Sequence, residues 1–347
     1  MYRWAENEDQ AAVMALWAQD FESYEPYYSW YFKDVYQPTL TLCDFDGPRL
    51  LAMLQLAPYT LALRGTAVQA AYLVGVITDP AFRGQGRGQA LLGRAHDWLR
   101  EQGYLAALLY TDIPGFYQPL GYRHCYQRHA LDLPAAQFPL FLLPGACQGA
   151  WRAGDLDADM PAVAEIYTSM TKRYDGYIRR TREDWQKYLG EHNCDGALLT
   201  LAGEQAYLLY TLDQEKLRII ELGFADAGFL AGSITCAVRL AEAAGAARLI
   251  WPAPFDAPQL LPQIPAKLWQ PQPFVMARWL EEPAAVRAFN CPAAERQILA
   301  RLDTAALTKL LFGVEGALAE DSKLMPEERQ RLAERFPPLP LWVNEYT

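Results

Sequence analysis

The sequence has no apolar run long enough to span a membrane, which needs about 20 predominantly apolar residues. Its first ten residues, MYRWAENEDQ, carry charges where a signal peptide would have an apolar stretch. These two absences predict a cytoplasmic protein without a membrane partner.

Signatures of metal sites and disulfide frameworks are also missing. The cysteines lie far apart without Cys-x-x-Cys spacing, and the histidines show no ligand spacing (Cys43, Cys125, Cys147, Cys194, Cys236, Cys291; His96, His124, His129, His192). We therefore expect buried free thiols and no bound metal.

Positive charge is scarce, since 31 Lys and Arg residues face 41 Asp and Glu residues and the formal net charge is −10. Such a chain repels nucleic acid and anionic lipid, and mildly favours a cationic ligand such as an amine. The content of 52% hydrophobic and 21% charged residues is that of a folded protein. With roughly 100–200 residues per domain, 347 residues predict two domains and an appendage.

The first part of the chain reads as a mixed sheet with one long helix. A short amphipathic helix is expected over residues 9–20, followed by the aromatic segment FESYEPYYSWYF. Three antiparallel strands are indicated by the segments TLTLCDF, LLAMLQLAPYTLAL and AVQAAYLVGVIT. Asp46-Gly47-Pro48 and Arg64-Gly65 separate these segments as turns. A helix between Leu91 and Leu99 then joins the strand AALLYT into a βαβ unit, and a last strand is expected near residues 128–133.

The second part repeats this order of elements without one of its motifs. Prolines at positions 134, 139 and 144 indicate a linker, and the strands ALLTLA, QAYLLYTL and LRIIELGF follow it. Before the next helix stands ADAGFLAGS, which lacks Arg-x-x-Gly-x-Gly spacing.

The segment VGVITDPAFRGQGRGQALL, residues 74–92, places glycines between a strand and a helix. Glycines allow the backbone to approach a ligand closely, and the positive end of the helix favours phosphate. A ligand that carries a pyrophosphate is therefore predicted, while a glycine-rich turn between packed elements stays open as the alternative. A Rossmann start fits poorly because the preceding strands are antiparallel, and the Gly-Lys-Ser/Thr ending of a P-loop is missing.

The stretch Arg83-Gly84-Gln85-Gly86-Arg87-Gly88 resembles the R/Q-x-x-G-x-G/A acetyl-CoA motif of the GNAT acetyltransferases, and GFYQPLGY resembles their downstream tyrosine motif. Further segments are LQLAPYTLALRG, AAYLVGVITDPAFRGQGRG, the degenerate second part and an end with LTKLLFG and RFPPLPLWVNEYT. With these, the sequence resembles the Eis-like (enhanced intracellular survival) acetyltransferases over nearly the whole chain. The resemblance implies an α/β (α+β) protein with tandem GNAT folds, in which helices flank mixed, mostly antiparallel sheets. It implies a catalytic GNAT domain at 1–134, a linker at 135–150, a degenerate GNAT-like domain at 151–281 and a short sterol-carrier-like segment at 282–347.

The resemblance also implies roles for single residues. Acetyl-CoA would be held by the strand end and by the glycine-rich loop (Val76, Thr78, Arg83, Gly84, Gln85, Gly86, Arg87, Gly88). Tyr117 would protonate the leaving thiolate, and the terminal carboxylate of Thr347 would act as the base. From the residues alone, packing of Tyr117 in the core and a frayed chain end stay open.

The predicted activity is direct acetyl transfer from acetyl-CoA to a primary amine of a small molecule or peptide. Trp30, Asp20 and Glu345 are candidates for the amine pocket, although such aromatic and acidic residues also serve as core and solvated surface. The resemblance implies homo-oligomers. Two alternatives are a GNAT-like protein that binds acyl-CoA or a small molecule without turnover, and a scaffold that binds no coenzyme.

Overall fold

The structure is a computed structural model that describes residues 1–21, 23–143, 151–281, 287–319 and 323–344. The chain forms two compact units from interleaved segments. The first unit takes residues 1–126, 176–179 and the described chain from Phe274 onward, and the second takes residues 127–175 and 180–273. Each unit holds one mixed, mostly antiparallel sheet, which confirms the predicted fold class.

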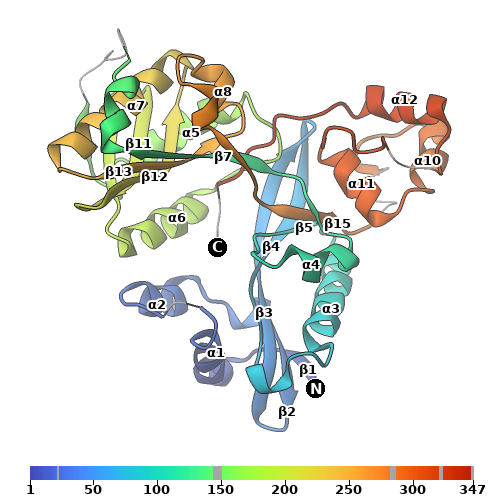
Figure 1. The fold of residues 1–347 in the computed structure, drawn as a ribbon. Coiled ribbons are helices and arrows are strands. Elements are labelled where there is room, and N and C mark those ends of the chain that lie inside the picture. Colours follow the sequence, from blue (N-terminus) through green and yellow to red (C-terminus); the bar gives the residue numbers. More distant parts are fainter. Residues whose placement is uncertain (22, 144–150, 282–286, 320–322, 345–347) are drawn as a thin grey trace. The chain divides into compact units, whose positions relative to one another are not determined.

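The sheet of the first unit has the strand order β1-β2-β3-β4-β5-β15-β6, and β9 pairs with β3. Figure 1 labels β1 to β5 and β15 of this sheet. Its strands are β1 (Tyr2–Trp4), β2 (Thr41–Asp46), β3 (Arg49–Leu63), β4 (Thr66–Thr78), β5 (Ala106–Leu109), β6 (Arg123–His124), β9 (Tyr177–Ile178) and β15 (Met276–Trp279). Antiparallel pairing of β2 with β3 and of β3 with β4 confirms the predicted meander. Gly47 and Gly65 lie in its two turns and have positive φ angles, which glycine adopts readily. β4 and β5 pair in parallel, as a βαβ unit requires.

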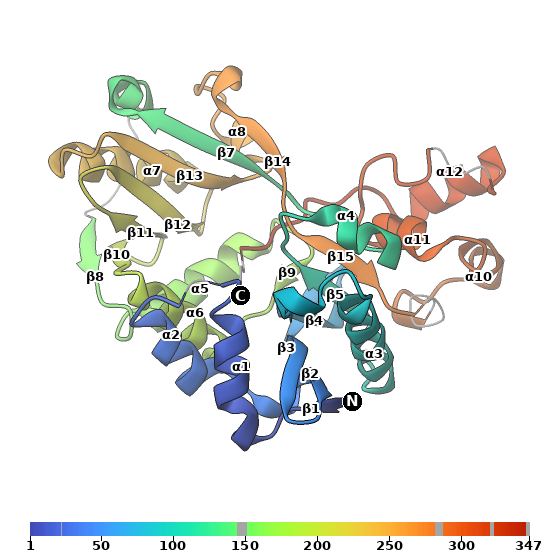
Figure 2. The same cartoon turned by 60° about the horizontal axis from the view of Figure 1, so that its bottom comes forward.

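Helices cover both faces of this sheet (Figures 1 and 2). α1 (Gln10–Trp17) and α2 (Tyr27–Trp30) lie on one face, and α3 (Arg87–Glu101) lies on the other. Alternation along β4 supplies both cores, since Tyr72 packs in the cluster of Trp17 whereas Leu73 packs in the cluster of Leu92. Each fully buried side chain of this size contributes about 1.5–3 kcal/mol of hydrophobic free energy.

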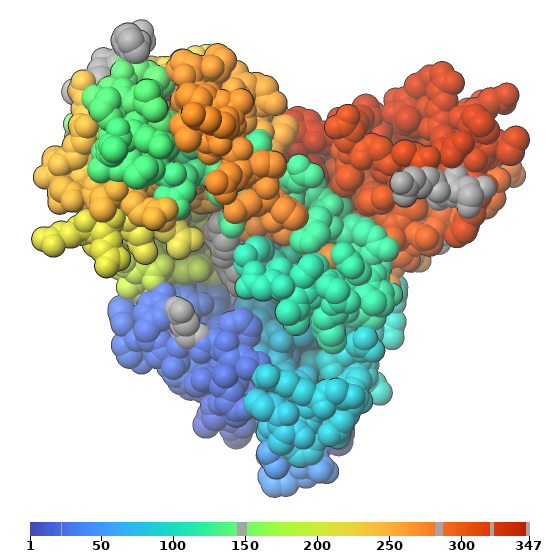
Figure 3. Space-filling model, in the orientation of Figure 1, coloured from blue at the N-terminus to red at the C-terminus, as the bar shows by residue number. Residues whose placement is uncertain are grey.

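The described chain after Phe274 returns to the first unit. It contains α10 (Ala293–Leu299), α11 (Thr304–Leu311) and α12 (Pro326–Arg335). The residues of this segment are coloured red in Figure 3. The guanidinium of Arg64, in the turn between β3 and β4, donates to the carbonyl oxygens of Leu310 and Leu311 at 3.0 and 2.8 Å and so caps the end of α11. The likeness of this segment to a sterol-carrier domain stays a prediction.

The second unit is built around the strand order β14-β7-β13-β12-β11-β10-β8. Its strands are β7 (Gln127–Pro134), β8 (Arg152–Gly154), β10 (Leu198–Ala202), β11 (Ala206–Leu212), β12 (Lys216–Phe224), β13 (Arg248–Pro254) and β14 (Gln270–Pro273). Its helices are α5 (Met160–Thr171), α6 (Arg182–Cys194), α7 (Gly228–Ala243) and α8 (Ala257–Leu260). β12 and β13 pair in parallel around α7, so the βαβ unit of the first sheet recurs.

One strand expectation was wrong. The strand near residues 128–133 was expected to close the first sheet, but β7 pairs with β13 and β14 in the second unit. The first sheet instead contains β15, which pairs with β5 on one side and with β6 on the other. The compact units therefore do not follow the predicted contiguous domains, because alternation identifies a strand without identifying its partner.

Membrane-spanning helices and metal clusters are absent from the described residues. In this part of the chain every helix is too short or too polar to cross a bilayer, and no group of three or more His, Cys, Asp or Glu side chains could hold a metal. Cys43, Cys125, Cys236 and Cys291 are buried, and Cys194 is partly buried. Cys147 lies outside the described residues.

Candidate functional site

A β-bulge interrupts β4 close to its end. Met53 of β3 pairs with Ile77 and Gln55 pairs with Val74, so Gly75 and Val76 together face one residue of β3. Gly75 has a φ of +58°, and a Cβ atom placed on it would lie 2.7 Å from Cζ3 of Trp17. Only glycine meets both conditions, because it tolerates the left-handed conformation and leaves space for the indole ring.

Beyond the bulge, β4 separates from β5. The two strands pair from Ala70 to Tyr72, and β4 then continues to Thr78 without a strand partner on this edge among the described residues. The free edge exposes backbone N–H and C=O groups that an extended ligand can pair with.

The glycine-rich loop follows directly. Asp79 accepts a hydrogen bond from the N–H of Ala81 at 3.0 Å and caps a short 3₁₀ turn, Pro80–Phe82. Gly84 and Gly86 have φ angles of +74° and +75°, and α3 begins directly after Gly86. A Cβ atom on either glycine would meet nothing within 4 Å, so the helix entrance is open to a ligand.

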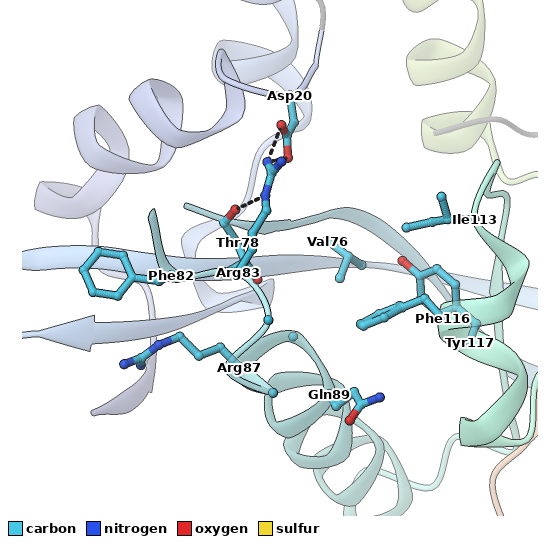
Figure 4. Close-up of a pocket in the computed structure, with 13 residues that line it drawn as sticks. Asp20, Val76, Thr78, Phe82, Arg83, Arg87, Gln89, Ile113, Phe116 and Tyr117 are labelled. Carbon is cyan, nitrogen blue, oxygen red and sulfur yellow. Dashed lines mark hydrogen bonds and ion pairs between the residues drawn. The ribbon is translucent and has the colours of Figure 1, made fainter. Parts of the chain in front are cut away.

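Both arginines of the loop are held by carboxylates. Nη2 of Arg83 lies 2.6 Å from both carboxylate oxygens of Asp20, and its Nε donates to the carbonyl oxygen of Thr78 at 3.0 Å (Figure 4). Nη1 of Arg87 donates to Oδ2 of Asp44 at 2.7 Å. An anion at this entrance would therefore meet backbone N–H groups before a free guanidinium.

Tyr117 is the last residue of α4 (Pro114–Tyr117) and is buried. Its ring stands edge-on to the rings of Phe116 and Tyr122, and its hydroxyl points toward Val76 (Figure 4). Burial raises the pKa of Tyr117 to about 12, so its phenol stays protonated at neutral pH.

These features line one pocket of about 540 Å³. Its lining residues are Asp20, Val76, Thr78, Phe82, Arg83, Gly84, Gly86, Arg87, Gly88, Gln89, Ile113, Phe116 and Tyr117. The free edge of β4, the helix entrance and the phenol thus belong to the same cavity. Such a cavity can hold an elongated anionic ligand with a reactive end near Tyr117.

The pocket brings most of the predicted site residues together. Gln85 is exposed and Trp30 packs against Tyr27 with ring centroids 6.1 Å apart, and neither is among the described residues that line the cavity. Asp20 lines the cavity, but as the ion-pair partner of Arg83. Glu345 and Thr347 lie outside the described residues.

Four residues that line the pocket were missed by sequence reasoning, namely Phe82, Gln89, Ile113 and Phe116, and so was Gly75 at the bulge. Gly75 carried a signal, because a glycine inside a strand pattern often marks a bulge. Phe116 carried no sequence signal beyond its place in GFYQPLGY. Its ring explains why residue 88 is glycine, because a Cβ atom on Gly88 would lie 3.2 Å from Cζ of Phe116.

Residues 1–125 match the family model of the acetyltransferase (GNAT) domain. No curated protein matches the sequence. A GCN5-related N-acetyltransferase structure from Anabaena variabilis aligns over 100% of both chains with 16% identity and a TM-score of 0.82. A conserved protein of unknown function from Enterococcus faecalis aligns over 100% of this chain and 99% of its own, with 15% identity and a TM-score of 0.83. Eis1 from Mycobacterium abscessus aligns over 82% of this chain and 75% of its own, with 15% identity and a TM-score of 0.64. At these identities the structural likenesses show the fold alone.

Proposed function

From the premise that residues 1–125 form a GNAT acetyltransferase domain, we propose that the chain transfers acetyl directly from acetyl-CoA to a primary amine of a small molecule or peptide. The supporting observation is that the free edge of β4 joins an open helix entrance to a protonated tyrosine within one pocket. Acetyl-CoA has the matching chemistry, because its pantetheine arm joins a diphosphate to a thioester.

In this proposal the backbone supplies most of the coenzyme contacts. The N–H groups of Gly84 to Gly88 and the positive end of α3 receive the diphosphate, with Gln85 as part of the same loop. Val76 and Thr78 on the free edge of β4 pair with the amides of the pantetheine arm. The side chains of Arg83 and Arg87 add positive charge at the loop.

The reaction requires that the sulfur of the departing thiolate gains a proton and that the nitrogen of the attacking amine loses one. The neutral amine attacks the thioester carbonyl carbon, the C–S bond breaks, and the phenol of Tyr117 gives its proton to the departing thiolate. An alkyl thiol has an ordinary pKa of about 8.5. Because the pKa of Tyr117 is about 12, this transfer must be coupled to the proton that the new amide nitrogen loses, which restores the phenol.

We propose further that the acceptor side uses residues outside the cavity described above. The terminal carboxylate of Thr347 would take the proton of the acceptor ammonium, and Glu345 with Trp30 would bind the cation. Asp20 belonged to this predicted set, but its pairing with Arg83 supports a role beside the coenzyme.

The second unit supports a single coenzyme site. At the start of α7, Oδ1 of Asp226 accepts a hydrogen bond from the N–H of Gly228 at 2.8 Å. A carboxylate therefore lies at the N-terminus of α7, where it would repel an anion.

Thiol release tests the proposal. Acetyl-CoA is mixed with the protein and with a panel of polyamines, aminoglycosides and lysine peptides, and free thiol is measured over time. Turnover with at least one amine is expected. Coenzyme binding by calorimetry without thiol release for any amine would favour the alternative of a GNAT-like protein that binds acyl-CoA without turnover.

A further inference from the structure

The last turn of α1 and the residues after it contact both β4 and the glycine-rich loop. Trp17, the last residue of α1, packs on the bulge at Gly75. Asp20 lies in the turn that follows and pairs with Arg83 at the start of the glycine-rich loop (Figure 4). In Figure 3 the blue surface of the N-terminal segment adjoins the cyan surface of the segment that contains α3.

The two ion pairs of the loop differ in burial. Asp44, the partner of Arg87, is only 3% exposed and also pairs with the N-terminal ammonium of Met1 at 3.3 Å. Asp20 and Arg83 are 33% and 49% exposed. Breaking the pair of Arg87 with the buried Asp44 would remove one of the two cations beside that carboxylate, whereas water can solvate both partners of the exposed pair.

Asp20 lines the cavity that the diphosphate enters in the proposed function. A carboxylate there repels phosphate, and its contact with both oxygens occupies Nη2 of Arg83. Asp20 and the phosphates are therefore two anions that compete for one guanidinium.

We propose that Asp20 is an affinity-setting residue: its exchangeable ion pair with Arg83 weakens coenzyme binding until the diphosphate displaces it. This inference rests on the proposed function, because it requires a phosphate-bearing ligand in this pocket. The buried Arg87–Asp44 pair holds the loop in place and does not exchange. Weaker binding of the coenzyme favours release of the product thiol after transfer.

Calorimetry with coenzyme A tests the competition at low and high salt. Asp20→Asn frees Arg83 and removes a negative charge, so the dissociation constant should fall about three- to ten-fold at low salt. Arg83→Gln should weaken binding because Asp20 is then unpaired, and the double variant should bind more tightly than Arg83→Gln alone. All these differences should shrink at high salt.

Two controls separate this effect from general ones. Glu25→Gln makes the same charge change on the same segment, but Glu25 bonds to Ser29 and is not among the residues that line the pocket, so affinity should stay at the wild-type value. Asp20→Glu keeps the charge and should also stay near wild type. Thermal unfolding checks that every variant is folded.

The outcomes distinguish the inference from its premise. If the wild type does not bind coenzyme A, the proposed function fails. If the wild type binds it and Asp20→Asn binds equally or less tightly, only the competition is refuted.

Discussion

Replacing Gly75 by alanine adds one methyl group at the bulge of β4 and probes the two constraints described there. The φ of +58° costs a residue with a Cβ atom about 1–2 kcal/mol. The methyl carbon would also lie 2.7 Å from the Trp17 ring, and overpacking of this kind costs about 1–3 kcal/mol. We expect the free energy of unfolding to fall by roughly 2–5 kcal/mol.

Two other glycines give matched controls for the same substitution. Gly65 has a φ of +72° and no atom within 4 Å of a Cβ position, so Gly65→Ala should cost the conformational part alone, about 1–2 kcal/mol. Gly93 lies inside α3 with open space around it, so Gly93→Ala should stabilise the protein by about 0.5–1 kcal/mol.

Urea denaturation followed by circular dichroism measures all three variants. The expected order of stability is Gly93→Ala, wild type, Gly65→Ala and Gly75→Ala. A Gly75→Ala variant no less stable than Gly65→Ala would show that Trp17 moves away at no cost, and the reasoning about close packing at the bulge would be refuted.

Four further results are expected. Tyr117→Phe should lower turnover about 100-fold with unchanged coenzyme affinity, whereas Tyr104→Phe beyond the far end of α3 should change neither; near-normal turnover of Tyr117→Phe would return Tyr117 to a packing role. Gly86→Val should abolish calorimetric binding of coenzyme A, since its φ of +75° and the phosphate path both exclude a branched side chain, and unchanged affinity would contradict the site. Burial and the nearby Arg278 lower the pKa of His96 to about 3, below its unfolded value, so stability is lost as pH falls below about 6.5, by ~2 kcal/mol between pH 7 and pH 5. A His96→Gln variant should show a flatter urea midpoint over this range, and an equal slope would exclude His96 as the cause. Deleting the final residue, Thr347, should cut turnover without unfolding the protein, and full activity would remove it as the base.

Local features of the first unit were predictable because short-range chemistry determines them. Gly47 and Gly65 marked turns that need positive φ, and Leu91 to Leu99 marked a helix with one apolar face. The loop at Gly86 was identifiable because a backbone with positive φ angles needs glycine, and glycine is visible in the sequence.

Features that depend on distant partners could not be predicted in the same way. Alternating burial in β7 fits either sheet, so the sequence pattern did not show that Leu131 and Leu133 pack in the second unit. The pair between Asp20 and Arg83 joins positions 63 residues apart and has no local signal. The packing of Trp17 on Gly75 is a similar case, because a glycine in a strand does not indicate which side chain packs beside it.

The position of β15 between β5 and β6 has a consequence for the order of synthesis. Met276 leaves the ribosome about 150 residues after His124, which corresponds to roughly 8–30 s of translation at about 5–20 residues per second. Throughout that interval β5 and β6 lack the strand that joins them, and unpaired strand edges are sites where nascent chains aggregate or meet chaperones. A fragment that stops at residue 134 never receives this strand, so it should be insoluble when expressed alone, and solubility should return when residues 274–344 are supplied on the same chain.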